Sequence, residues 1–244
     1  MMKCTVILTV ALGACLLVPT ASAGDGGVGF SRNRLIYPAS QKAIKITVSN
    51  HGDSPYLVQA GVSGDPVKKA PAPFVVTPPL FRLEGNSQND IRIVAAGAGA
   101  SLPKDRESVF YFYGTAIPGG GEAADSNAGV SATLSIAMRS VMKLFWRPEG
   151  LKPSALDAPG KMQFIREAKG VRVKNPTPYY QSFSSMAFDG KAQDMDRVTS
   201  MVAPFSEQVF ASDVPVSKVT WQVMNDYGGA TDEVTQSLSA GDGK

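Results

Sequence analysis

Short segments in which apolar and polar residues alternate recur along the chain, and turn residues separate them. Residues 43–48 alternate and end in the turn cluster 50–55, and residues 56–62 alternate again. A period of two places successive side chains on opposite faces of a strand. Similar or β-branched and aromatic runs predict further strands at 74–76, 90–94 and 108–117. No segment of helical length has a 3.6-residue period, so the spacing indicates a β-sandwich.

The segment 130–146 is long for a strand and changes character along its length. Its first part has one apolar face, which comprises Val130, Ala132, Leu134, Ile136 and Met138. The alternation breaks near Ser140, because every position of 141–146 except Lys143 is apolar. A β-bulge, or a passage into a region buried on both faces, would explain the break. The pattern fits a central core strand as well as an exposed edge strand around 133–146, and Lys143 tips it slightly toward the edge, because a lone ammonium is costly in a core.

A second set of strands follows a proline-bounded linker. Residues 147–153 contain two prolines and a glycine, which is typical of a stiff connection between domains. After it, strands are predicted at 162–165, 171–173, 182–188, 206–210 and 219–224. The sequence therefore predicts an all-β protein with a second, smaller sandwich.

The first residues read as an export signal. Lys3 precedes an apolar run over 4–18, and Ala21-Ser22-Ala23 is a small-residue cleavage site. We therefore predict a signal peptide at 1–23, an N-terminal domain at 24–148, a linker at 149–153 and a C-terminal domain at 154–244. The segment 12–15 also resembles a lipoprotein cleavage box. The apolar residues after Cys15 speak against that alternative.

Composition removes several classes of function. Both cysteines, Cys4 and Cys15, lie in the predicted signal, so the mature chain has no disulfide, thiolate or cysteine metal site. The net charge of +3 is small and scattered, which is unlike a nucleic-acid-binding surface. His51, the only histidine, sits in a turn without a partner motif, and no paired carboxylates, phosphate loop or cofactor motif is present. We expect no catalysis, no cofactor, no metal and no small-molecule substrate.

Several motifs together resemble the periplasmic chaperones of chaperone–usher pilus assembly. The resemblance includes Arg34-Leu35-Ile36-Tyr37 near the start and Asn175-Pro176-Thr177-Pro178-Tyr179-Tyr180 in the second domain. The other matching segments, in order along the chain, are 55–60, 77–84, 102–108, 141–148 and 225–229. Each motif alone is weak, but their common order over about 28–229 is specific.

The resemblance implies two immunoglobulin-like β-sandwich domains in a boomerang arrangement. Members of this family bind pilus (fimbrial) subunits in the periplasm by lending an edge strand, and they deliver them to an outer-membrane usher. The implied partners are therefore pilin subunits and the usher. The sequence leaves open whether the free protein self-associates to cover its edge.

The resemblance also implies roles for particular residues. Arg34 and Lys143 match the cations that hold the carboxylate of the subunit. The face that enters the groove of the subunit would consist of Val130, Ala132, Leu134, Ile136 and Met138. A charge network between the domains would comprise Glu107, Arg147 and Asp226. Usher-binding positions would be Pro55, Leu57, Gln59, Thr77, Pro78 and Arg92.

Two features depart from the family pattern, and two other classes of protein remain to be weighed. Many relatives have a disulfide in the second domain, which this chain cannot form, and the loop over 118–133 fits neither the short-loop nor the long-loop subclass. The first rival is a secreted immunoglobulin-like adhesin or pilus subunit, which an internal pair of cations fits poorly. The second is a lectin-like hydrolase, which would need a pair of carboxylates in a pocket.

Overall fold

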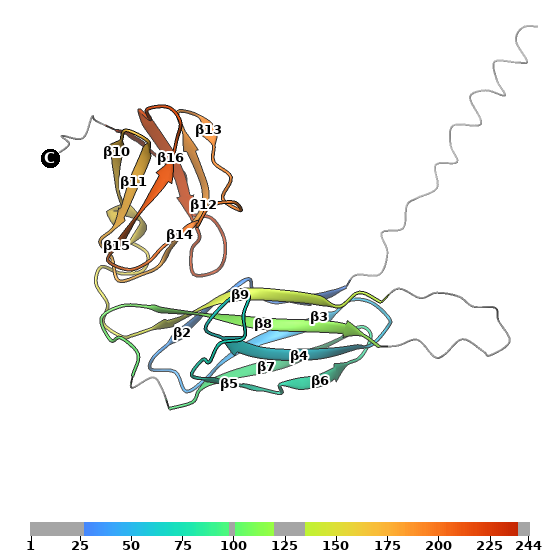
Figure 1. The fold of residues 1–244 in the computed structure, drawn as a ribbon. Helices are drawn as coiled ribbons and strands as arrows, with labels where there is room; N and C mark the ends of the chain where they lie inside the picture. The colour runs from blue at the N-terminus through green and yellow to red at the C-terminus, as the bar shows by residue number, and fades with distance from the viewer. Residues whose placement is uncertain (1–26, 98–100, 120–134, 239–244) are drawn as a thin grey trace, which may run out of the picture.

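The computed structural model describes residues 27–97, 101–119 and 135–238, which form two lobes built almost entirely of strands (Figure 1). Strands of the first lobe are β1 (Val28–Phe30), β2 (Arg34–Pro38), β3 (Ile44–Asn50), β4 (Tyr56–Ser63), β5 (Phe74–Thr77), β6 (Leu80–Leu83), β7 (Ser87–Ala95), β8 (Ser108–Pro118) and β9 (Met138–Arg147). They make two sheets, with the orders β1-β3-β7-β5 and β2-β9-β8-β4-β6. The first lobe is therefore a β-sandwich.

The second lobe is a smaller sandwich. After a short 3₁₀ helix, η3 (Pro159–Lys161), its strands are β10 (Gln163–Glu167), β11 (Gly170–Asn175), β12 (Gln181–Phe188), β13 (Lys191–Ala192), β14 (Met201–Val202), β15 (Ser206–Ala211), β16 (Lys218–Val223) and β17 (Val234–Ser237). The sheet orders are β10-β11-β15 and β13-β12-β16-β17, and β14 also pairs with β12. The predicted all-β, two-sandwich fold is confirmed. The sequence pattern did not predict β1, β6, β13, β14 and β17.

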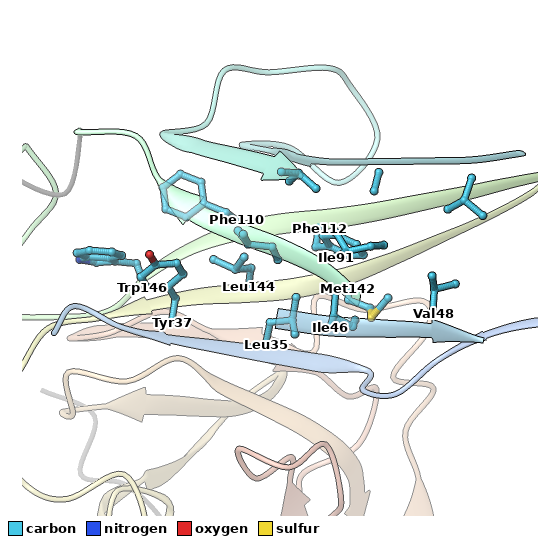
Figure 2. Packing of buried hydrophobic residues seen from close by; sticks show 14 of the residues in the cluster. Leu35, Tyr37, Ile46, Val48, Ile91, Phe110, Phe112, Met142, Leu144 and Trp146 are labelled. Atoms are coloured by element: carbon cyan, nitrogen blue, oxygen red, sulfur yellow. The ribbon is translucent and has the colours of Figure 1, made fainter. Parts of the chain in front are cut away.

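Alternate residues of the strands fill the core of the first lobe. In β3, for example, Ile46 and Val48 are buried while Lys45 is exposed, as the alternation predicts. Figure 2 shows side chains from several strands meeting between the two sheets. Aromatic rings close one end of this core, where the ring of Tyr37 lies 5.1 Å from that of Trp146. The second lobe has its own buried cluster around Phe183 and Trp221.

The strand β9 has two halves with different neighbours. Along 143–146 it lies between β8 and β2, and β2 pairs with it in parallel from Arg34↔Lys143 to Pro38↔Arg147. Along 138–142 it pairs with β8 only. We call 138–142 the open half and 143–147 the closed half. The expectation of an edge strand over 133–146 was therefore wrong for the closed half, which is a central strand.

The open half has one paired edge because the chain crosses from one sheet to the other near its start. β1 pairs with β3 in one sheet, and after residues 31–33 β2 pairs with β9 in the other sheet. The ring of Phe30 occupies the turning point and packs against Phe112, with centroids 5.9 Å apart. Since β2 begins only opposite Lys143, no strand in the described part of the chain pairs with the outer edge of the open half.

The break in alternation at Ser140 is not a bulge. The pairing of β8 with β9 runs without a shift from Ser108↔Trp146 to Ala116↔Met138. Instead, the closed half is buried on both faces. Leu144 belongs to the core of the first lobe, whereas the Phe145 ring packs against Tyr180 of the second lobe, with centroids 5.6 Å apart.

Candidate functional site

The open half of β9 carries exposed apolar side chains. Met138 and, two residues upstream, Ile136 are each 65% exposed. Met138 shares its strand face with Met142 and Leu144, which belong to the core of the first lobe. An edge strand with unpaired backbone groups and an apolar face is a template for pairing with another chain. Three predicted members of this face, Val130, Ala132 and Leu134, lie outside the described residues.

Two cations stand side by side where the open half ends. Arg34 begins β2, and its Cα partner across the sheet is Lys143 of β9. Arg34 is only 4% exposed, and its guanidinium lies 4.1 Å from the centre of the Phe145 ring. Arg34 and Lys143 lie far apart in the sequence. The parallel pairing of β2 with β9 brings them together in space, as the resemblance implied. We call Arg34 and Lys143 the cationic pair.

The cationic pair is not neutralised by the protein. Burial lowers the pKa of both side chains, and the charge of Arg34 lowers the pKa of Lys143 further. Among the described residues, no carboxylate forms an ion pair with either cation, and the buried Nε of Arg34 has no hydrogen-bond partner. A buried donor or charge without a partner is costly, and a carboxylate that binds here would remove that cost. The arrangement therefore has the charge and the free donor that binding an anion would require.

A second charge cluster joins the two lobes a short distance along β9. The guanidinium of Arg147 donates from Nε to Glu107 Oε1 (2.8 Å), and from Nη1 and Nη2 to the two carboxylate oxygens of Asp226 (2.6 and 2.7 Å). Glu107 Oε2 also accepts from the backbone N–H of Tyr180 (2.8 Å). The predicted network of Glu107, Arg147 and Asp226 is thus assembled in space, with contributions from both lobes.

Burial and pairing oppose each other in this network. Burial raises the pKa of Glu107 in spite of its neighbour Arg147. Burial is the largest single influence and favours the neutral forms of Arg147 and Asp226. Their mutual hydrogen bonds and the attraction of the opposite charges nearby together outweigh it, so the pKa of Arg147 is raised and that of Asp226 is lowered. The two carboxylates are therefore committed to Arg147 and act on Arg34 only at longer range.

Contacts between the lobes that the sequence did not reveal surround Arg34. Its Nη1 donates to the hydroxyl of Ser182 in β12 (3.2 Å). The neighbouring Asn33 donates from Nδ2 to the carbonyl of Gly228 (3.1 Å), and Gly228 has a φ of +83°. A Cβ on Gly228 would lie 1.6 Å from Oδ1 of Asn33, so any other residue would displace the Asn33 side chain in addition to straining the backbone. A local pattern cannot predict such contacts, because they join residues far apart in sequence.

The predicted usher-binding residues spread over both sheets of the first lobe. Leu57 and Gln59 are exposed on β4, and Thr77 and Arg92 are exposed Cα partners on β5 and β7. Pro78 lies in the turn from β5 to β6, and Pro55 precedes β4. The turn connects the two groups, since Pro79 accepts a hydrogen bond from the N–H of Ala60 in β4 (2.9 Å). Two further exposed apolar residues lie beside them and were not singled out in the sequence: Leu80 is the Cα partner of Gln59, and Ile117 is that of Leu57.

A cavity of about 430 Å³ lies beside Arg34 and Arg147 and is lined from the second lobe by Tyr179, Tyr180 and Asp226. No group of three or more metal-ligating side chains occurs in the described ranges. No helix in them has the length and hydropathy to cross a bilayer.

Comparisons with known proteins agree with this geometry. Residues 27–152 match the family model "Pili and flagellar-assembly chaperone, PapD N-terminal domain", and 157–235 match "Pili assembly chaperone PapD, C-terminal domain". The probable fimbrial chaperone ElfD of Escherichia coli O157:H7 is 38% identical over 233 residues, which cover 93% of this chain and 95% of that protein. The chaperone HifB of Haemophilus influenzae is 39% identical over 214 residues, which cover 85% of this chain and 87% of HifB.

Solved structures of pilus chaperones also match this chain. The structure of the Salmonella enterica SafA pilin in complex with the SafB chaperone matches with a TM-score of 0.75 and 31% identity, covering 87% of this chain and 96% of the matched chain. The E. coli chaperone DraB matches with a TM-score of 0.73 and 35% identity, covering 87% of this chain and 97% of that chain. The chain belongs to the PapD family of pilus-assembly chaperones.

Proposed function

We propose that this protein is a periplasmic chaperone that binds pilus subunits through the open half of β9 and delivers them to an outer-membrane usher. One observation carries the proposal: an uncovered strand edge ends at two neighbouring cations that no carboxylate in the described chain pairs. The SafA–SafB structure, whose title names a pilin bound to a chaperone, supports pilin subunits as the cargo. The proposal includes no enzymatic activity, and it leaves the rival adhesin or pilus-subunit function without support.

The proposed binding mode implies a direction for the bound strand. β2 occupies the edge of the sheet beside the closed half and runs parallel to β9. A subunit strand beside the open half, with its terminal carboxylate at the cationic pair, has to run toward the start of β2. It is therefore parallel to β9, and its carboxylate lies against Arg34 and Lys143.

The cationic pair then sets the register. Side chains alternate along a strand, so a slip of one residue would turn the wrong face of the subunit inward. Ile136 and Met138, and by extension Leu134, Ala132 and Val130, would enter the groove of the subunit. Each large apolar side chain that becomes buried contributes about 1.5–3 kcal/mol. Met138 shares its strand face with Met142 and Leu144, so the core of the subunit would continue the core of the chaperone.

The remaining predicted residues receive supporting roles. Glu107, Arg147 and Asp226 would hold the two domains at the angle that keeps the cationic pair beside the open half. Leu57, Gln59, Thr77, Pro78 and Arg92, with Pro55, would contact the usher. The predicted boundaries, with a signal peptide at 1–23, domains at 24–148 and 154–244 and a linker at 149–153, belong to this proposal, as does the periplasmic location.

Co-expression with a pilin subunit tests the function. We expect a soluble periplasmic complex with one chaperone for each subunit. Arg34→Ala and Lys143→Ala should each abolish capture, whereas Arg32→Ala, which removes an exposed cation two residues away, should not. Capture by both cleft variants at the level of the wild type would refute the role of the cationic pair.

A further inference from the structure

Ser182 is the side chain of the second domain that contacts the Arg34 guanidinium by a hydrogen bond. It is only 3% exposed, and its hydroxyl accepts from Arg34 Nη1 at 3.2 Å. Its backbone is held on two sides, because its carbonyl accepts from the N–H of Met224 (2.8 Å) and its Cα partner in β14 is Met201. The hydroxyl is thus a fixed point from which the second domain orients a cation of the first.

The partner that Ser182 offers is neutral. A carboxylate at this place would hold Arg34 through a stronger, charge-assisted hydrogen bond, but it would also cancel the charge. The two nearby carboxylates, Glu107 and Asp226, are instead bound to Arg147. Arg34 is therefore anchored and keeps its full positive charge.

The contact also selects which edge of the guanidinium remains available. Arginine presents five N–H donors in a planar fork, and one edge, formed by Nε and Nη2, matches a carboxylate in a bidentate arrangement. Ser182 engages Nη1, and Phe145 covers a face of the plane. The Nε on the remaining edge is the buried donor for which the described residues supply no acceptor.

We propose that Ser182 is a positioning residue of the subunit-binding cleft, which anchors Arg34 without neutralising it and leaves the Nε–Nη2 edge for the terminal carboxylate of the subunit. This inference rests on the proposed function and adds the second domain to the carboxylate receptor. It also means that an acidic residue at position 182 would occupy Arg34 from within the chaperone and compete with the subunit.

The test compares two variants of the same shape, Ser182→Asn and Ser182→Asp, in the full chain. The probe is a pilin subunit that the wild-type protein captures on co-expression, with the amount of complex as the readout. We expect Ser182→Asp to capture at least about tenfold less than Ser182→Asn, because it takes over a charge-assisted hydrogen bond. The free Asp variant should unfold at a temperature no lower than that of the Asn variant. Lower capture without lower stability is a signature that a purely structural role would not give.

A smaller pair of variants covers the case in which both larger residues prevent folding. Ser182→Thr keeps the hydroxyl and Ser182→Val replaces it with a methyl group of similar volume. The Thr variant should capture more subunit than the Val variant. Equal capture within the folded pairs would overturn the inference.

An Arg34→Ala arm separates this inference from the proposed function. If Arg34→Ala loses capture while the Asp and Asn variants capture equally, the function stands and the role of Ser182 is wrong. If Arg34→Ala captures as well as the wild type, the carboxylate receptor itself is wrong.

Discussion

The two halves of β9 belong to one strand with one register against β8, but they differ in the pairing of their other edge and in the balance of charge at their ends. The closed half lies between two strands and ends at Arg147, whose charge two carboxylates balance. The open half has one neighbour and ends at two cations that no described carboxylate balances. Paired strand edges and balanced charges stabilise the fold, whereas an unpaired edge and unbalanced charges at a fixed place are features that a binding site would need. The difference can be tested from both sides.

The largest effect is expected in the closed half, from Arg147→Ala. The variant leaves Glu107 buried without its cation, and breaking a buried pair in this way costs about 3–5 kcal/mol. The midpoint of urea denaturation should fall markedly. Arg34→Ala is the matched comparison, since it removes a buried arginine that has no ion pair and should change the midpoint far less. An equal loss in the two variants would erase the distinction between the halves.

The next effect lies just upstream of the open half and concerns capture of the subunit. Ile136→Asp places a carboxylate where the groove of the subunit would bury it, and we expect capture to fall by at least about a hundredfold, since an unpaired buried charge costs several kcal/mol. The free chaperone should fold normally, because Ile136 is 65% exposed. Val209→Asp, at an exposed valine of the second domain, is the control. Loss of folding in Ile136→Asp would mean that this segment belongs to the core of the chaperone.

A smaller effect of opposite sign is expected from Lys143→Met. Burial and the charge of Arg34 lower the pKa of Lys143, so its ionised form disfavours the free fold. Because the pKa in the folded state is lower than in the unfolded state, this penalty is present below the folded pKa and fades as the pH rises through it. The variant should therefore be slightly more stable than the wild type at pH 7, by roughly 1 kcal/mol or less, while it loses capture. A clear loss of stability would indicate that Lys143 is paired in the free protein.

The smallest effect on stability is expected outside β9, at the proposed usher-binding residues. Leu57→Asp and Arg92→Ala change exposed positions, so the free energy of unfolding should stay within about 0.5 kcal/mol of the wild type, and capture should not change. Surface pili should nevertheless be reduced when these variants replace the wild type in a complete assembly system. Defective capture in either variant would show that these residues serve the subunit and not the usher.

Much of the fold followed from local pattern, and the site did not. Strands such as β3 and β8 were predictable because one face of each is buried and the other is not, which a period of two records. β6 was missed because it follows Pro78-Pro79, and β17 because all four of its residues are exposed. The division of β9 depends on where β2 begins, which is a long-range pairing that β9 itself does not encode. Arg34 and Lys143 were identified by family resemblance, and Ser182 had no signal at all.

The point at which β2 begins would also set the position of the C-terminus of a bound subunit. In the proposed complex, a subunit strand that pairs with the open half would end where β2 begins, at Arg34, so positions along it would be counted back from its C-terminal residue. Every subunit bound in this way would then need its groove at the same distance from its C-terminus, whatever its sequence. A subunit lengthened by a C-terminal tag would no longer place its carboxylate at the cationic pair when its groove is in register. Such a subunit should therefore bind poorly even though its groove is intact, so recognition would depend on the position of the C-terminus as well as on sequence.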